Sequence, residues 1–211
     1  MSFLAHKIMR IGIYCGTFSP PHLGHVAAAK AFMEQMWLDV LYIIPTGIPP
    51  HKAAGETASP MERLAMCERA FSSLEGVIIS DIELRQQGKS NTVETLRQIA
   101  QRAPEDSRLF LLMGTDMLLS MDSLHGVDQI FRLCYPVYMR REGADPVLDG
   151  QIVKQIEKLN ARYGKVVRRI VGEPLPISST KIRSLISQGK SIQGLVPAAV
   201  EQYIRDHNLY V

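Results

Sequence analysis

The sequence predicts an α/β fold: a doubly wound, mostly parallel sheet with helices on both faces, in a single domain. Short apolar runs alternate with amphipathic segments along nearly all of the 211 residues. Several of these runs, among them VLYII and LFLLM, are almost continuously apolar, which suits strands that helices cover on both faces. With 46% apolar and 21% charged residues, the chain has an ordinary globular composition and enough length for one sizeable core.

Six segments are predicted to be strands, because each is a short apolar run bounded by polar or turn-forming residues. The longest irregular stretch, 45–60, is rich in Pro, Gly and Ala, and loops of that length are usually functional or mobile. In chain order, the predicted strands span residues 11–15, 40–45, 77–80, 108–114, 134–140 and 165–172.

Four amphipathic segments between these runs are predicted to be helices. Ser59, Pro60 and Glu62 give the second helix an N-cap, a proline at its first position and a capping box. Asn91 is the predicted N-cap of the third helix, and Glu94 follows it three positions later. Gly164 is the predicted C-cap of the fourth helix. The predicted helices span residues 25–36, 59–71, 91–103 and 146–164.

Composition and charge exclude several classes of protein. The net charge of +3 is compatible with anionic small molecules, but no block of Lys and Arg predicts binding to nucleic acid. No apolar stretch approaches the ~20 residues of a membrane span, and the first ten residues do not resemble a signal peptide. Cys15, Cys67 and Cys134 are far apart and form no CxxC pair, so we expect neither disulfides nor a zinc site. We expect a cytoplasmic protein with no membrane or nucleic-acid partner.

The stretch GTFSPPHLGH, residues 16–25, follows the first predicted strand and leads into the first helix. Gly16 and Gly24 allow close approach of a ligand to the backbone, and free N–H groups at a helix start favour a phosphate. His22 and His25 are three residues apart, so both rings can face the same way and donate to phosphate oxygens. The structural alternative is a pair of surface or hydrogen-bonded histidines near a turn. The sequence therefore predicts a phosphate site beyond the first strand.

This stretch resembles the (G/S)xFDPxHxGH signature of the nucleotidyltransferase superfamily. Near the other end of the chain, ISSTKIRSLI, residues 177–186, resembles the ISSTxIR motif of the adenylyltransferases. Further segments are similar to motifs of the bacterial nicotinate-mononucleotide adenylyltransferases: IPTGIPPHK, SNTVETL, LLMGTDML and LVPAAVEQYIRDHNLY. The resemblance implies a Rossmann-like fold and one adenylyltransferase domain over 1–211, with a small C-terminal helical part from about 177–211.

The resemblance also implies an activity in NAD biosynthesis, the transfer of AMP from ATP to nicotinate mononucleotide, which gives deamido-NAD and pyrophosphate. The attacking group is already a phosphate anion, so alignment and charge neutralisation suffice, and no nucleophilic side chain is needed. Mg²⁺ is expected to be bound through the ATP phosphates and water, without a cage of protein ligands. ATP and nicotinate mononucleotide are the expected partners, and a homo-oligomer is left open.

The family motifs imply functional roles for the residues at the matching positions of this chain. His22, His25 and Arg183 are the implied catalytic residues, with His25 nearest the group that is transferred. The implied binding residues are Gly16, Thr17, Phe18, Gly24, Lys52, Thr92, Gly114, Asp116, Arg140, Ser178, Ser179 and Thr180.

Their implied roles differ. Thr17 and Lys52 meet the ATP phosphates, and Ser178 to Thr180 hold the leaving phosphates at a helix start. Asp116 helps to bind nucleotide hydroxyls or to orient the substrate, Thr92 helps to hold the nicotinate mononucleotide, and Arg140 binds a phosphate or the adenine. The alternatives are a solvated loop lysine for Lys52, and helix capping for Asp116, Thr92 and the Ser178 to Thr180 segment.

The chain departs from the family pattern at several positions. Cys15 stands where the family often has Gly, Ser19 where it has Asp, and Asn91 where it has Tyr. Leu124 stands at the position of a tryptophan that stacks on the pyridine ring, and we hypothesise that His125 supplies a ring instead. Two alternatives to the main assignment remain: a sibling transferase for nicotinamide mononucleotide or another phosphate acceptor, and a nucleotide-binding protein without catalysis.

Overall fold

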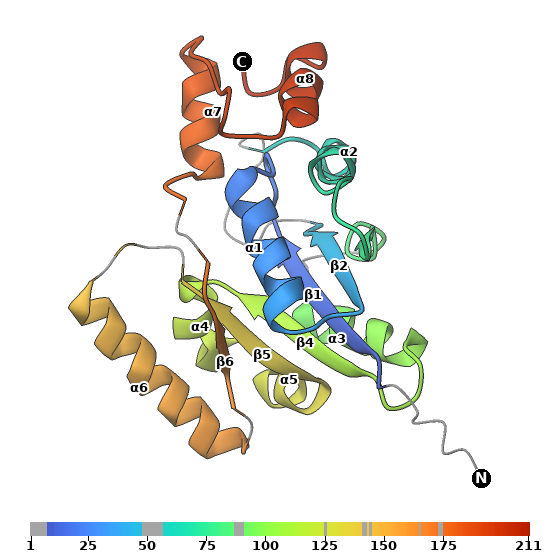
Figure 1. Ribbon diagram of the computed structural model, residues 1–211, viewed down its shortest axis with the longest axis vertical. Coiled ribbons are helices and arrows are strands. Elements are labelled where there is room, and N and C mark those ends of the chain that lie inside the picture. The colour runs from blue at the N-terminus through green and yellow to red at the C-terminus, as the bar shows by residue number, and fades with distance from the viewer. Residues whose placement is uncertain are drawn as a thin grey trace.

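The computed structural model describes residues 8–47, 57–86, 91–124, 126–140, 143, 145–164, 166–172 and 175–211. A six-stranded sheet lies at its centre, with the strand order β3-β2-β1-β4-β5-β6 and every neighbouring pair parallel (Figure 1). The predicted doubly wound sheet is confirmed. Its strands are β1 (Arg10–Gly16), β2 (Val40–Pro45), β3 (Val77–Ile79), β4 (Arg108–Met113), β5 (Cys134–Met139) and β6 (Arg168–Ile170).

Two apolar cores cover the two faces of the sheet. Along β4 the side chains alternate, since Leu109 and Leu111 enter one core while Phe110 and Leu112 enter the other. The first core lies under α1 (Leu23–Gln35), α2 (Pro60–Ala70), α7 (Ser179–Ser187) and α8 (Ala198–Asp206). The second lies under α3 (Thr92–Arg102), α4 (Thr115–Leu119), η1 (Met121–Ser123), α5 (Val127–Leu133) and α6 (Pro146–Tyr163).

Helix boundaries follow the predicted capping residues. Ser59 accepts a hydrogen bond from the Glu62 backbone N–H, and the Glu62 carboxylate accepts one from the Ser59 N–H at 2.6 Å. The Asn91 side chain caps α3 by accepting from the Val93 N–H, and Gly164 ends α6 with φ of +62°. Each of these local signals is confirmed.

The last strand is shorter than predicted. Residues 165–172 were expected in it, but β6 contains only Arg168–Ile170, because β6 is an edge strand paired with the last three residues of β5. The short helices α4 and α5, which follow β4, were not predicted.

The C-terminal helices α7 and α8 lie beyond the carboxyl ends of β1 and β2, where α8 packs against α2 (Figure 1). Ligands of open parallel sheets bind at this edge, at the point where the strand order reverses. Here that point is between β1 and β4. None of the helices in the described part of the chain is long and apolar enough to cross a membrane.

Candidate active site

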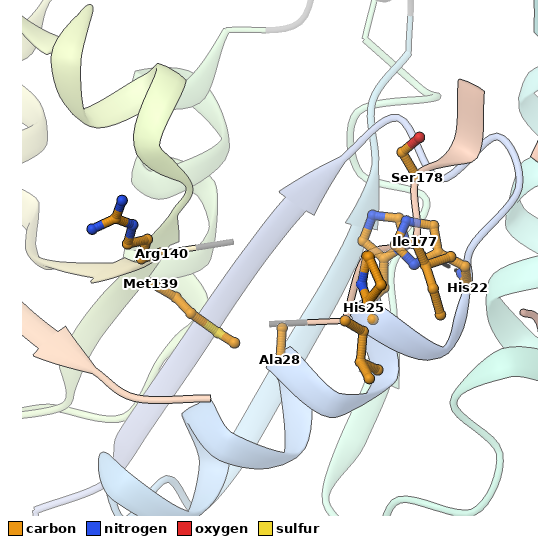
Figure 2. A pocket seen from close by; sticks show the side chains of 10 residues that line it. His22, His25, Ala28, Met139, Arg140, Ile177 and Ser178 are labelled. Atoms are coloured by element: carbon orange, nitrogen blue, oxygen red, sulfur yellow. Dashed lines mark hydrogen bonds between the residues drawn. The ribbon is translucent and has the colours of Figure 1, made fainter. Parts of the chain in front are cut away.

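The loop between β1 and α1, residues 17–22 and called here the first loop, carries the histidine motif to the carboxyl edge of the sheet. His22 is the N-cap residue of α1, and His25 lies in the first turn of that helix. The two rings stack with their centroids 3.7 Å apart and their planes at 29° (Figure 2). The structure therefore brings the two predicted histidines together on one face.

A hydrogen bond fixes the tautomer of neutral His25. The backbone N–H of His22 donates to Nδ1 of His25 at 3.2 Å, so the ring proton of the neutral form resides on Nε2. Behind the ring, the edge-on Phe18 ring has its centroid 5.0 Å away, and Phe18 itself is only 1% exposed. Phe18, predicted to bind nucleotide, lies in the core and supports His25.

The histidine pair lines a cavity of about 270 Å³, called here the histidine cavity (Figure 2). Gly24 allows the His22 ring to lie over the helix start, because a Cβ atom at Gly24 would be 3.0 Å from His22 Nδ1. The walls come from the start of α1, the end of β5 and the segment before α7: His22, Gly24, His25, Ala28, Met139, Arg140, Leu175, Pro176, Ile177 and Ser178.

The second predicted motif starts α7 and is attached to the first loop. The Ser178 hydroxyl caps α7 by accepting from the Lys181 N–H, as the capping alternative proposed. The Ser179 hydroxyl donates to the Pro20 carbonyl at 2.9 Å. Arg183 donates to the Ser19 carbonyl at 2.9 Å and to the Thr180 hydroxyl at 3.3 Å. The two motifs, about 160 residues apart in sequence, therefore form one unit.

Ser19, a residue of the first loop at the position where the family has Asp, is fully buried. Its hydroxyl accepts from the Ala58 N–H at 3.1 Å and lies 2.9 Å from the hydroxyl of Tyr210. Burial raises the pKa of Tyr210 to about 12, so the phenol stays protonated at neutral pH and can share this hydrogen bond. The C-terminal turn thus helps to hold the first loop.

A second cavity, of about 300 Å³, opens at the strand-order reversal between β1 and β4 and is called here the switch-point cavity. Gly114 is the N-cap of α4 and Asp116 is an exposed residue in its first turn, so Asp116 is not the helix cap. The lining residues are Tyr14, Cys15, Gly16, Leu112, Met113, Gly114, Thr115, Asp116 and Met117. Gly16, Gly114 and Asp116, all predicted to bind nucleotide, therefore line one cavity.

The structure assigns Arg140 other partners and Thr92 a place at the start of α3. Arg140 lines the histidine cavity, but its guanidinium pairs with Asp149 and donates to the Gly143 carbonyl, pointing away from the histidines (Figure 2). Thr92 is the first residue of α3, and the cap that was considered for it is supplied by Asn91. Lys52 lies outside the described residues.

The aromatic wall expected for a pyridine ring is not supplied by residue 124. Leu124 follows η1 and packs against the core under α3 to α6. His125, the hypothesised replacement, lies outside the described residues.

Sequence reasoning missed Arg63 of α2, which is 1% exposed and donates to the Thr17 carbonyl in the first loop at 3.1 Å. The sequence does contain a signal for the burial of Arg63. Met66, Cys67 and Ala70 follow it at spacings of three, four and seven, which places all four residues on the same apolar face of the helix. An arginine on such a face is buried only with hydrogen-bond partners.

Comparisons with known proteins show the family of this chain. Residues 13–185 match the cytidylyltransferase-like family. Relatives that carry the name probable nicotinate-nucleotide adenylyltransferase include two bacterial proteins. The one from Halalkalibacterium halodurans is 36% identical over 95% of this chain and 91% of its own length. The one from Pseudomonas aeruginosa PAO1 is 34% identical over 95% of this chain and 97% of its own length.

Solved structures share the fold. The Plasmodium falciparum nicotinic acid mononucleotide adenylyltransferase complexed with NaAD aligns with a TM-score of 0.75 at 15% identity, covering 96% of this chain and 97% of that one. The same enzyme complexed with APC gives a TM-score of 0.72 at the same identity and coverage. The chain therefore belongs to the cytidylyltransferase-like family of nucleotidyltransferases, in the branch whose members carry the name nicotinate-nucleotide adenylyltransferase.

Proposed function

We propose that the protein transfers AMP from ATP to nicotinate mononucleotide, producing deamido-NAD and pyrophosphate in NAD biosynthesis. The observation that carries the proposal is the stacked His22 and His25 pair at the start of α1, with the start of α7 across the same cavity. Imidazole N–H groups and two helix N-termini there offer donors to a polyphosphate. The names of the relatives support the choice of reaction.

In this proposal ATP occupies the histidine cavity and the mononucleotide occupies the switch-point cavity. A phosphate oxygen of the mononucleotide attacks the α-phosphorus of ATP, and a new P–O bond forms. The bond from the α-phosphorus to the bridging oxygen breaks, and pyrophosphate leaves with that electron pair. His25 donates from Nε2 to the α-phosphate, where negative charge must be stabilised in the transition state.

Mg²⁺ is proposed to arrive on the ATP phosphates. In the described part of the chain no three His, Cys, Asp or Glu side chains gather as metal ligands. On the ATP phosphates, Mg²⁺ can keep water and phosphate oxygens as its ligands. When bound in this way, the ion supplies charge neutralisation on the triphosphate.

A pyrophosphate-release assay with ATP and Mg²⁺ tests the proposed function. We expect release with nicotinate mononucleotide, and only background release without an acceptor. Nicotinamide mononucleotide and phosphopantetheine complete the acceptor panel. Turnover with phosphopantetheine and with neither pyridine nucleotide would contradict the proposal and favour a sibling transferase.

Replacing Leu124 by tryptophan is expected to raise kcat/KM for the pyridine mononucleotide several-fold. An added aromatic stack is worth ~0.5–1.5 kcal/mol beyond the area it buries, and ~1.4 kcal/mol corresponds to a tenfold change. The measurement is kcat/KM for nicotinate and nicotinamide mononucleotides, and we expect nicotinate to be preferred in both enzymes.

Leu148→Trp is the matched control, because Leu148 of α6 is also partly buried and packs on the same core. It introduces the same ring and should leave kcat/KM unchanged. An equal change in both variants, or none in Leu124→Trp, would show that residue 124 does not face the pyridine.

A further inference from the structure

The most buried charged side chain in the described part of the chain is Arg63, on the inner face of α2. It is 1% exposed, and in that part of the chain no carboxylate forms an ion pair with it. Burial lowers the pKa of its guanidinium, yet arginine remains protonated at neutral pH. A buried cation of this kind is tolerated only where hydrogen bonds replace its lost water.

Three backbone carbonyls supply those hydrogen bonds. Nε donates to Ala58 at 3.2 Å, one terminal nitrogen to Thr17 at 3.1 Å and the other to Gly47 at 2.8 Å. Thr17 is the first residue beyond β1, Gly47 is the second beyond β2, and Ala58 precedes the cap of α2. One side chain therefore joins three separate backbone segments at the carboxyl edge of the sheet.

The junction lies where two parallel strands stop pairing. The Thr46 N–H still donates to the Gly16 carbonyl at 2.8 Å, which continues the β1–β2 ladder by one step. Arg63 then binds the Thr17 carbonyl, one residue beyond β1, and the Gly47 carbonyl, two residues beyond β2. Its guanidinium thus sets where the first loop separates from the segment that follows β2.

Holding the Thr17 carbonyl also orients the peptide that begins the first loop. In a trans peptide the C=O and the following N–H point in opposite directions, so the Phe18 N–H points away from Arg63. Two further carbonyls of the loop, those of Ser19 and Pro20, are held from α7 by Arg183 and Ser179. Donors from α2 and α7 therefore hold three of the first four carbonyls of the first loop.

We propose that Arg63 is a positioning residue for AMP transfer, which orders the first loop and the start of the segment after β2 before ATP binds. This inference rests on the proposed function of the first loop. A loop that is ordered in advance loses less conformational entropy on binding and keeps the reacting groups aligned. Arg63 acts through the loop backbone and need not touch the substrate.

The guanidinium is required because of its shape. Its planar fork presents donors in three fixed directions, whereas a lysine ammonium is a compact group on a flexible stem. Arg63→Lys keeps the charge and most of the volume but cannot reach all three carbonyls together. Arg69→Lys is the matched control: Arg69 is an exposed residue of the same helix and donates to the Ala65 carbonyl.

The first measurement does not depend on activity. Hydrogen–deuterium exchange of the free protein is followed in peptides that cover residues 16–25 and the Thr46 amide. We expect at least tenfold faster exchange in Arg63→Lys than in wild type, and no change in Arg69→Lys. If wild type transfers no AMP, the proposed function fails, and the exchange rates still decide whether Arg63 orders the loop.

Steady-state kinetics on the same variants give the second measurement. For Arg63→Lys we expect a several-fold rise in KM for ATP together with at least a tenfold fall in kcat, and no change for Arg69→Lys. Millimolar methylguanidinium should restore activity to Arg63→Ala, whereas methylammonium or NaCl at the same concentration should not.

Two results would overturn the inference. One is that Arg63→Lys has the same rate of hydrogen–deuterium exchange in the first loop and the same KM for ATP as wild type. The other is a fall in kcat that matches the unfolded fraction, with KM for ATP unchanged, since a purely structural role predicts that pattern. If Arg63→Ala does not fold, Arg63→Lys alone decides between these outcomes.

Discussion

Replacing His25 by alanine is expected to lower kcat by at least ~10²-fold while KM for ATP changes little. A donor aimed at charge that develops in the transition state is typically worth ~3 kcal/mol, and ~1.4 kcal/mol corresponds to a tenfold change. The backbone N–H of His22 fixes Nδ1 of His25 as an acceptor, which leaves the proton on Nε2 as the donor. The measurement is steady-state kinetics with ATP and nicotinate mononucleotide.

His207→Ala is the matched control for this prediction. His207 is exposed at the end of α8, where its ring stacks on Tyr203, remote in sequence from the histidine motif. Its loss should leave kcat unchanged. A His25→Ala enzyme with near wild-type kcat would restrict His25 to the structural role that its contacts with Phe18 and His22 also allow.

Replacing Gly24 by alanine is expected to lower kcat roughly tenfold, since displacements of about 1 Å can cost ~10²-fold and a smaller shift costs less. The added Cβ would be 3.0 Å from Nδ1 and 3.1 Å from Cε1 of the His22 ring. The ring must move by a few tenths of an ångström, and the stacked His25 ring moves with it. The measurement is kcat together with the thermal midpoint, which shows that the variant is folded.

Gly150→Ala is the control for Gly24→Ala. Gly150 lies inside α6, and a Cβ there meets nothing within 4 Å. Alanine should raise stability by ~0.5–1 kcal/mol through helix propensity and leave kcat alone. Equal kinetics in the two variants would show that the position of the His22 ring does not matter to catalysis.

The parts of the fold that sequence predicts are those set by local chemistry. Ser59 and Glu62 cap α2 because their partners are three residues apart, and Gly164 ends α6 because its positive φ suits glycine. The continuous apolar runs predict strands buried on both faces. Strand lengths are predicted less accurately, as β6 shows, because the length of a strand depends on how far its neighbour extends beside it.

Sequence predicts which residues lie together where a motif is local, and it misses contacts between distant segments. His22 and His25 stack because they share one helix start, so their spacing was enough. The bonds of Arg63 to Thr17 and Gly47 span 46 and 16 residues, and the pair of Ser19 and Tyr210 spans 191. No local pattern encodes such partners, because they depend on the tertiary packing of α2 and the C-terminal turn.

The central claim is that the histidine cavity carries out AMP transfer to nicotinate mononucleotide. Incubation with ATP labelled at the α-phosphate, Mg²⁺ and nicotinate mononucleotide, followed by separation of the nucleotides, tests it directly. We predict that the label moves into deamido-NAD at the rate of pyrophosphate release, and that His25→Ala slows both equally. Label that remains in ATP or appears only in AMP would contradict the account.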